Sequence, residues 1–129
     1  MTQKKRVVAL ISGRGSNLES LLIAQTDTDS AYEVVYVLSD CDAPGLEHAR
    51  SRGIENRSFM LADYSSRKSQ RDAIFSSVRE HNPDLIVLAG FMMIVPEQYT
   101  TEFLGKLINI HPALLPEFPG LDTHARAIA

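Results

Sequence analysis

The sequence is poor in the features that mark secreted and membrane proteins. Its 129 residues include one cysteine, Cys41, and no tryptophan. A single cysteine excludes an internal disulfide and fits a reducing cytoplasm, where we interpret Cys41 as a small strand-end residue rather than a nucleophile. No apolar run approaches the roughly 20 residues that span a bilayer. A cytoplasmic protein without membrane contact is therefore expected.

Positive charge is also scarce. The chain has 13 Lys and Arg residues and 16 Asp and Glu residues, which gives a formal net charge of −3. Such a chain has no overall basic field and is not expected to bind nucleic acid, although a local anion site needs no net positive charge. The four histidines show no metal-ligand spacing, so no metal is expected. They are His48, His81, His111 and His124, of which His48 and His81 are expected to be surface residues on helices.

Apolar runs alternate with helix signals along the whole chain, without a linker or a shift in composition. This order predicts a single α/β domain over residues 1–129, with an open, mainly parallel sheet and helices on both faces. The strands are expected at 7–12, 34–39, 54–59, 84–89 and 107–111. One helix is expected from Ser16, where Glu19 would complete a capping box. The others are expected from 42–44 to Gly53, over 66–81, over 96–103, and from about Thr123.

A glycine-rich turn, Gly13-Arg14-Gly15-Ser16-Asn17, joins the first expected strand to the first expected helix. Its backbone N–H groups would lie at a helix N-terminus, where free donors and the helix dipole favour a phosphate. Leu18 stands where the dinucleotide fingerprint needs a third glycine, and the longer Walker loop is absent. The turn therefore predicts a site for a mononucleotide or sugar phosphate. The alternative is a tight turn that merely needs glycine.

Two more segments follow expected strands and would share the ligand-binding edge of the sheet. Gly90-Phe91-Met92-Met93-Ile94-Val95 is apolar for a loop, and it either lines a slot for a flat heteroaromatic ligand or packs in the core. Asn109-Ile110-His111-Pro112 closes the last strand. Because residues two apart project to the same side of a strand, Asn109 and His111 would face one reacting centre. The alternative for His111 is a purely structural hydrogen-bonding role.

Together these motifs resemble the glycinamide ribonucleotide formyltransferases of the purine pathway. The likeness rests on the Gly-x-Gly-Ser-Asn-Leu turn, the Leu-Ala-Gly-Phe-Met run at 88–92, and the Asn-Ile-His-Pro-Ala-Leu-Leu-Pro run at 109–116 with Pro119-Gly120. The asparagine, histidine and Leu-Leu-Pro signature is shared by enzymes that use 10-formyltetrahydrofolate, including methionyl-tRNA formyltransferase and formyltetrahydrofolate deformylase. The Gly-Ser-Asn turn favours the glycinamide enzymes. A Rossmann-like formyltransferase fold acting on small molecules is implied.

The resemblance also implies a role for each motif. The turn residues Arg14, Gly15, Ser16 and Asn17 would hold the ribonucleotide phosphate. Other ribonucleotide contacts would come from Gly90, Phe91, Ile110 and Pro112, and folate contacts from Met92, Met93, Ile94, Val95 and Arg67. The substrate amine would attack the formyl carbon directly and give a tetrahedral species with an oxyanion. Asn109 would donate a hydrogen bond to that oxygen, and His111 would transfer a proton or stabilise the charge.

The sequence departs from the family pattern at three places. Ala113 stands where serine is usual, and Met93 stands where an arginine is often found beside the folate. Arg67 or Lys106 could replace that charge, although each is more readily interpreted as a solvated surface residue. Family members also extend past Ala129, and their further part carries an aspartate that pairs with the histidine.

The expected domain is therefore incomplete, with a phosphate-binding part at 1–100 and the start of a folate and catalytic part at 101–129. Without the orienting acid, we expect weak ribonucleotide binding and negligible turnover from the chain alone. Two alternatives stay open: another formyltransferase or hydrolase that uses 10-formyltetrahydrofolate, and a non-catalytic nucleotide-phosphate binding domain. Strand order and oligomeric state, monomer or homodimer, are not predicted.

Overall fold

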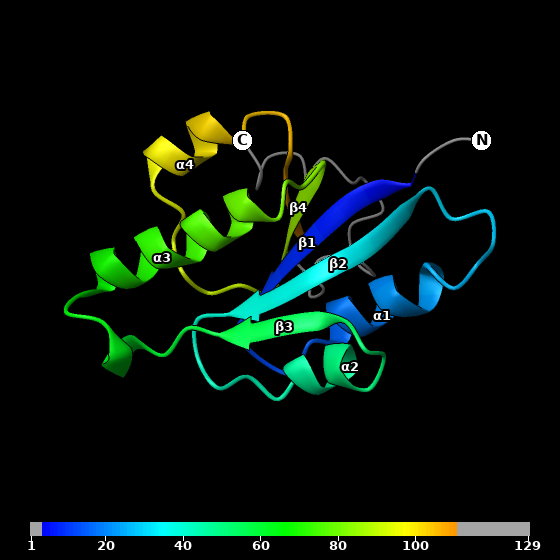
Figure 1. Ribbon diagram of the computed structural model, residues 1–129, viewed down its shortest axis with the longest axis horizontal. Helices are drawn as coiled ribbons and strands as arrows, with labels where there is room; N and C mark the ends of the chain where they lie inside the picture. The colour runs from blue at the N-terminus through cyan, green and yellow to red at the C-terminus, as the bar shows by residue number, and fades with distance from the viewer. Residues whose placement is uncertain (1–3, 111–129) are drawn as a thin grey trace, which may run out of the picture.

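The computed structural model describes residues 4–110 as one parallel sheet with helices on both faces (Figure 1). The expected α/β class is confirmed. Its strands are β1 (Lys5–Ile11), β2 (Tyr32–Ser39), β3 (Glu55–Ser58), β4 (Leu85–Ala89) and β5 (Leu107–Ile110). Its helices are α1 (Ser16–Ala24), α2 (Leu46–Arg50), the 3-10 turn η1 (Leu61–Asp63), α3 (Arg67–Glu80) and α4 (Glu97–Glu102). His111, Pro112 and the helix expected near Thr123 lie outside the described residues.

The strand order is β3-β2-β1-β4-β5, and every neighbouring pair is parallel. From β1 the chain adds β2 and β3 on one side, and then crosses by α3 to add β4 and β5 on the other. The order therefore reverses between β1 and β4. In open α/β sheets ligands bind outside the carboxyl ends of the strands at this reversal.

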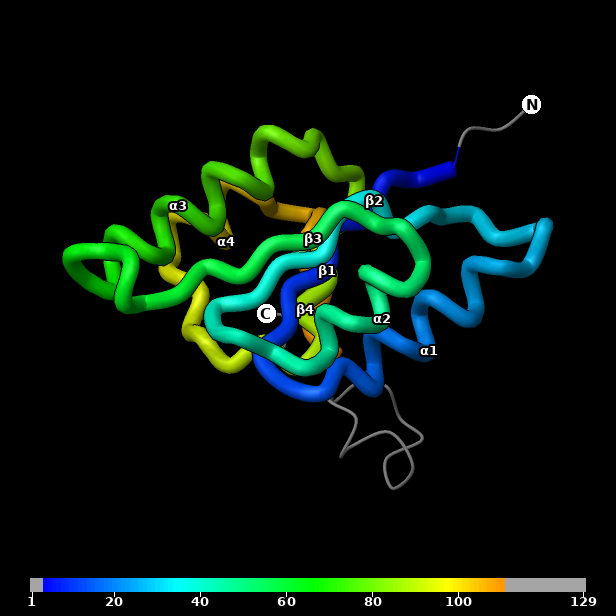
Figure 2. The backbone as a smooth tube through the Cα atoms, turned by 60° about the horizontal axis from the view of Figure 1, so that its bottom comes forward, coloured from blue at the N-terminus to red at the C-terminus, as the bar shows by residue number. Residues whose placement is uncertain are grey.

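Two apolar layers cover the sheet, and the alternation of side chains along the strands separates them. Figure 2 shows α3 with α4 on one side of the strands and α1 with α2 on the other. The first layer packs α3 and α4 on the sheet through residues that include Ile74, Phe75, Tyr99 and Phe103. The second packs α1 and α2 through Leu18, Leu22, Leu46 and Ala49.

In the described part of the chain no helix is both long and apolar enough to cross a membrane.

The start of α1 differs from the expected capping box. The N-cap is Gly15, which is left-handed with φ 75°, and no side chain caps the helix. Ser16 is already inside the helix, because the carbonyl of Gly15 accepts the N–H of Glu19 at 2.7 Å. The prediction that Ser16 caps the helix is therefore wrong. By contrast, α3 begins near Ser66 as expected, and the Ser66 hydroxyl caps the helix by accepting the Ser69 N–H at 3.1 Å.

Helix α2 and residue His81 also differ from expectation. Helix α2 is shorter than predicted, because it begins after Gly45 and gives way to a turn that ends at Gly53 with φ 70°. His81 is not a simple surface residue. Its ring stacks on Tyr36 with centroids 3.7 Å apart, and its Nε2 lies 3.0 Å from Oε2 of Glu55. The end of α3 lies over β2, so one face of this imidazole is covered.

Candidate functional site

Ser12 follows β1 and links three strand ends at the reversal point. Its hydroxyl donates to Oδ1 of Asp40 at 2.7 Å and accepts the N–H of Met92 at 2.8 Å. Its carbonyl oxygen lies 3.1 Å from Sγ of Cys41. The carboxyl ends of β1, β2 and β4 are thus tied together through one residue. Sequence reasoning missed Ser12, although a serine between a buried strand and a glycine turn is a signal that could have indicated it.

The glycine turn that follows Ser12 presents backbone donors. Gly13, Arg14 and Ser16 are exposed. The N–H groups of residues 14–17 donate to no acceptor within the described residues. They lie at the start of α1, where the first N–H groups of a helix have no intrahelical partner and the dipole is positive. The left-handed Gly15 beside right-handed α1 gives the concave arrangement of successive N–H groups that binds anions.

Helix α2 packs directly against this turn. The N–H of Gly45 donates to the carbonyl of Gly13 at 2.9 Å, and Nε2 of His48 lies 3.2 Å from the carbonyl of Arg14. A Cβ on Gly45 would come within 2.8 Å of the backbone of Gly13 and Arg14, so only glycine fits there. His48 is half-buried, which differs from the surface position expected for it. Local sequence patterns do not indicate this contact, because His48 and Arg14 are 34 positions apart.

The segment after β4 divides its side chains between core and solvent. Gly90 turns the chain with φ 76°, and Phe91 is buried in the α3 layer. Met93 and Val95 pack partly against the same layer, whereas Met92 and Ile94 are 80% and 85% exposed. The core-packing interpretation therefore holds for Phe91, Met93 and Val95. The ligand-lining interpretation stays a prediction for Met92 and Ile94. Two large apolar side chains exposed beside the strand reversal form a surface on which a flat apolar ring can pack.

Asn109 lies on β5 opposite Leu88 and is half-buried. Leu107 packs against the α3 layer and Ile110 against the α1 layer. By alternation, Asn109 shares the face of Leu107, which is also the face of Met93. Its proposed partner His111, and Pro112, lie outside the described residues, so their shared orientation with Asn109 stays a prediction.

The two candidate cations differ in their position. Arg67 is exposed at the first position of α3, a helix that starts from the carboxyl side of the sheet. Lys106 is exposed immediately before β5, and so it lies at the amino side. Since ligands bind at the carboxyl side, Arg67 is the better placed of the two to meet a bound ligand.

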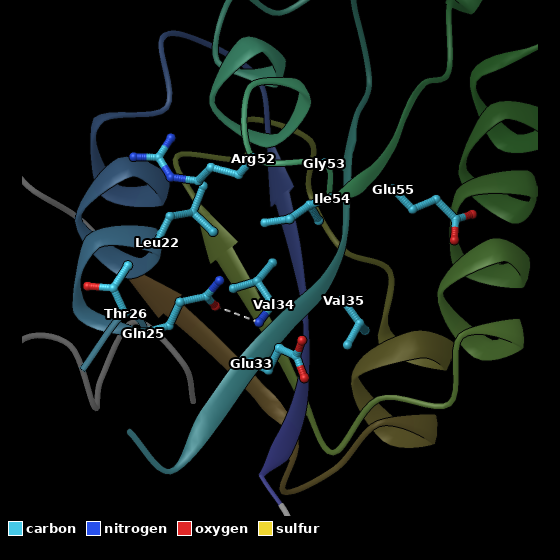
Figure 3. Close-up of a pocket in the computed structure, with 10 residues that line it drawn as sticks. All are labelled: Leu22, Gln25, Thr26, Glu33, Val34, Val35, Arg52, Gly53, Ile54 and Glu55. Atoms are coloured by element: carbon cyan, nitrogen blue, oxygen red, sulfur yellow. Dashed lines mark hydrogen bonds between the residues drawn. The ribbon is translucent and has the colours of Figure 1, made fainter. Parts of the chain in front are cut away.

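A pocket of about 450 Å³ lies at the opposite edge of the sheet (Figure 3). It is bordered by the end of α1 and the starts of β2 and β3, and its lining includes Arg52 and Ile54. On its wall the side-chain oxygen of Gln25 accepts the N–H of Val34 at 2.7 Å. This hydrogen bond pairs a backbone donor of β2 that lies before the stretch paired with β3. This pocket is therefore separate from the strand reversal.

Cys41 follows β2, lies between Asp40 and Asp42 in the sequence, and is partly buried. Burial, with the neighbouring Asp40 as a second cause, raises the pKa of the Cys41 thiol. A thiol held protonated in this way is a poor nucleophile, which agrees with a structural role. Among residues 4–110 no group of three or more His, Cys, Asp or Glu side chains is placed to hold a metal ion.

Comparison with known proteins gives consistent results. Residues 5–129 match the sequence model of a family described as formyl transferase. The chain is 39% identical over 123 residues to a phosphoribosylglycinamide formyltransferase of Escherichia coli (strain K12), covering 95% of this chain and 58% of the relative. It is 39% identical over 128 residues to the trifunctional purine biosynthetic protein adenosine-3 of Chironomus tentans, covering 97% of this chain and 9% of the relative.

A solved structure agrees with these relatives. The crystal structure of phosphoribosylglycinamide formyltransferase from Brucella melitensis superposes with a TM-score of 0.81 and 41% identity. The match covers 98% of this chain and 66% of that one. The chain thus spans about three-fifths of the length of the bacterial relatives it matches.

Proposed function

The chain belongs to the formyl transferase family, and we propose that it forms part of an enzyme that formylates the amino group of glycinamide ribonucleotide with 10-formyltetrahydrofolate. The observation that carries the proposal is the row of N–H groups at residues 14–17, which has no acceptor within the described residues and stands at the strand reversal. Relatives named for phosphoribosylglycinamide support the same substrate.

The turn would recognise the ribonucleotide by its phosphate. A doubly charged phosphate accepts several hydrogen bonds, and a row of backbone donors supplies them without a basic side chain. This explains how a chain with a net charge of −3 binds an anion. The side chain of Arg14 is exposed beside the turn and adds positive charge.

The exposed side chains of Met92 and Ile94 fit the folate. A pterin ring is flat and largely apolar on its faces, so it would cover these side chains while polar backbone groups of the segment meet its edges. Met93 and Val95 anchor the segment in the core, and Arg67 would meet the negative tail of the folate. Once bound, the folate supplies the formyl group.

Asn109 and His111 would act on the reacting atoms. The amine nitrogen would form a bond to the formyl carbon and give a tetrahedral species with an oxyanion. This species would collapse as the bond of that carbon to the folate nitrogen breaks, and one proton would pass from the amine to that nitrogen. The amide of Asn109 would donate a hydrogen bond to the formyl oxygen as negative charge develops on it. His111 would carry the proton. Further contacts to the ribonucleotide would come from residues after β4 and at the end of β5, namely Gly90, Phe91, Ile110 and Pro112.

We assign residues 1–100 to the phosphate-binding part of the domain and residues 101–129 to the start of its folate and catalytic part. Both substrates are small molecules. A chain with a single cysteine forms no internal disulfide, which is compatible with work in a reducing cytoplasm.

The test is an acceptor comparison with the full-length protein and 10-formyltetrahydrofolate. We expect formylation of glycinamide ribonucleotide, and a kcat/KM roughly a hundredfold lower for the ribonucleoside that lacks the phosphate, because several charge-assisted hydrogen bonds are lost. Preferred formylation of methionyl-tRNA, or hydrolysis as the main reaction, would assign the chain to another branch of the family. Binding of the ribonucleotide without turnover would support the non-catalytic alternative.

A further inference from the structure

The glycine turn at residues 13–17 is the proposed phosphate site and is called the phosphate turn below. Two of its carbonyl groups accept hydrogen bonds from α2 and its N-cap residue. The N–H of Gly45 donates to the carbonyl of Gly13 at 2.9 Å. Nε2 of His48 lies 3.2 Å from the carbonyl oxygen of Arg14. Because a carbonyl oxygen only accepts, the proton of the imidazole is placed on Nε2. Successive peptides of the turn are thus fastened to the same neighbouring segment.

This arrangement fixes the direction of the donors that follow. In a trans peptide the carbonyl and the next N–H point in opposite directions. With the carbonyls of Gly13 and Arg14 turned toward α2, the N–H groups of Arg14 and Gly15 are turned away from it. These two belong to the row of N–H groups at residues 14–17 that find no acceptor within the described residues. The contact with α2 therefore orients the donors of the turn.

The packing between the turn and α2 is close. A Cβ on Gly15 would lie 3.0 Å from Cα of Gly45 and 3.3 Å from Cδ2 of His48. On the other side of the imidazole, Oε2 of Glu19 lies 3.8 Å from Nδ1. The ring is therefore held between the turn and the first turn of α1. A change at His48 therefore acts first on the backbone of the turn.

We propose that His48, with Gly45, positions the phosphate turn and so sets the affinity for the ribonucleotide. The proposal rests on the proposed function, because the turn must bind the substrate phosphate for its direction to matter. His48 is a positioning residue, since its hydrogen bond goes to the backbone of the turn. Without the donor on Nε2 the peptide between Arg14 and Gly15 is free to rotate, and the phosphate loses aligned N–H groups.

The test compares two changes of His48 in the full-length protein. His48→Phe keeps a ring but has no donor, whereas His48→Gln keeps a donor that can reach the Arg14 carbonyl. We expect the Phe variant to raise KM and Kd for glycinamide ribonucleotide by roughly five- to tenfold, as loss of one aligned hydrogen bond predicts. Its kcat and its KM for the folate should stay within about twofold of wild type. The Gln variant should recover most of the affinity.

Controls keep the test decisive. Arg50→Ala changes an exposed residue of the same helix that pairs with Glu47, and it should alter neither constant. His48→Ala replaces the Phe variant if the larger ring does not fit, and thermal melting verifies folding. Gly45→Ala should weaken binding further, since its Cβ would collide with the turn.

Three results would overturn the positioning role. They are an unchanged KM in the variants without a donor, a loss of kcat with an unchanged KM, and equal behaviour of the Phe and Gln variants. If the wild-type protein is active, any of these results refutes the positioning role of His48 and leaves the proposed function untouched. If the wild-type protein neither binds nor formylates the ribonucleotide, the proposed function itself is refuted.

Discussion

The hydroxyl of Ser12 accepts the N–H of Met92 at 2.8 Å, across 80 positions of sequence. Ser12 immediately precedes the phosphate turn, and Met92 opens the exposed apolar surface after β4. One hydroxyl therefore connects the proposed ribonucleotide site to the proposed folate site. Its proton is directed to Asp40, which fixes the hydroxyl as an acceptor for Met92.

Replacing Ser12 by alanine should weaken folate binding. The Met92 N–H would lose its acceptor, and a hydrogen bond of this kind contributes about 1 kcal/mol. We expect the KM for 10-formyltetrahydrofolate to rise about fivefold in steady-state kinetics. Ser76→Ala on the exposed side of α3 is the matched control and should leave KM unchanged. Equal KM values in both variants would show that Met92 needs no support from Ser12.

Replacing Asn109 by alanine should reduce turnover and spare binding. If its amide stabilises the developing oxyanion, its loss should lower kcat about 10²- to 10³-fold, as for other oxyanion donors. The Kd of glycinamide ribonucleotide, measured by calorimetry, should stay within a few fold. Asn56→Ala on β3, whose amide donates to the carbonyl of Ile54, is a control that should retain activity. A variant of Asn109 with near-normal kcat would refute this role.

The thiol of Cys41 should react slowly with alkylating reagents. Burial, followed by the charge of Asp40, raises its pKa, so at pH 8 it holds less thiolate than an ordinary cysteine. We expect iodoacetamide to modify the folded protein more slowly than the protein in urea. Asp40→Asn should speed the reaction of the folded form modestly, because desolvation remains. Equal rates for folded and unfolded protein would contradict the raised pKa and the partial burial of the thiol.

The attachment of α4 to α3 should weaken in acid. Hydrogen bonds from Lys68 and from the Tyr99 hydroxyl lower the pKa of Asp72, and the guanidinium of Arg79 lowers the pKa of Glu102. A carboxyl with a lowered folded pKa stabilises the protein above its unfolded pKa and loses that contribution as pH falls through the folded value. We expect the melting temperature to fall below about pH 4.5.

Variants without these carboxyls test the assignment. Asp72→Asn and Glu102→Gln should show a smaller drop of the melting temperature between pH 5 and pH 3 than wild type. Each difference should be modest, because the ion pairs are partly exposed to solvent. Parallel curves for all three proteins would place the acid sensitivity elsewhere.

Local signals predicted much of the fold. All five strands were located within two residues of their observed bounds. Four of them are short, largely apolar runs, as buried parallel strands usually are, whereas β3 is polar and lies between the apolar residues Ile54 and Phe59. Ser66 indicated the start of α3 correctly, since the capping hydrogen bond is made within four residues. The prediction failed at Ser16, where a left-handed Gly15 shifts the helix start by one residue.

Contacts between distant residues could not be predicted in the same way. Strand order depends on which strands pair, and single-sequence patterns do not report pairing. The contacts of His48 and Gly45 with the turn arise only because β2 lies beside β1. Ser12 meets Met92 for the same reason, since β4 lies on the other side of β1. The motifs identified the two binding segments, and the sheet order shows how they come together.

The central claim is that the N–H groups of residues 14–17 bind the phosphate of the ribonucleotide. The most direct measurement is a titration of the ¹⁵N-labelled full-length protein with glycinamide ribonucleotide, followed by backbone amide NMR shifts. We predict that the amides of Arg14, Gly15, Ser16 and Asn17 shift most and saturate together with one Kd, and that inorganic phosphate moves the same amides. Saturating binding with these four amides unmoved would contradict the claim.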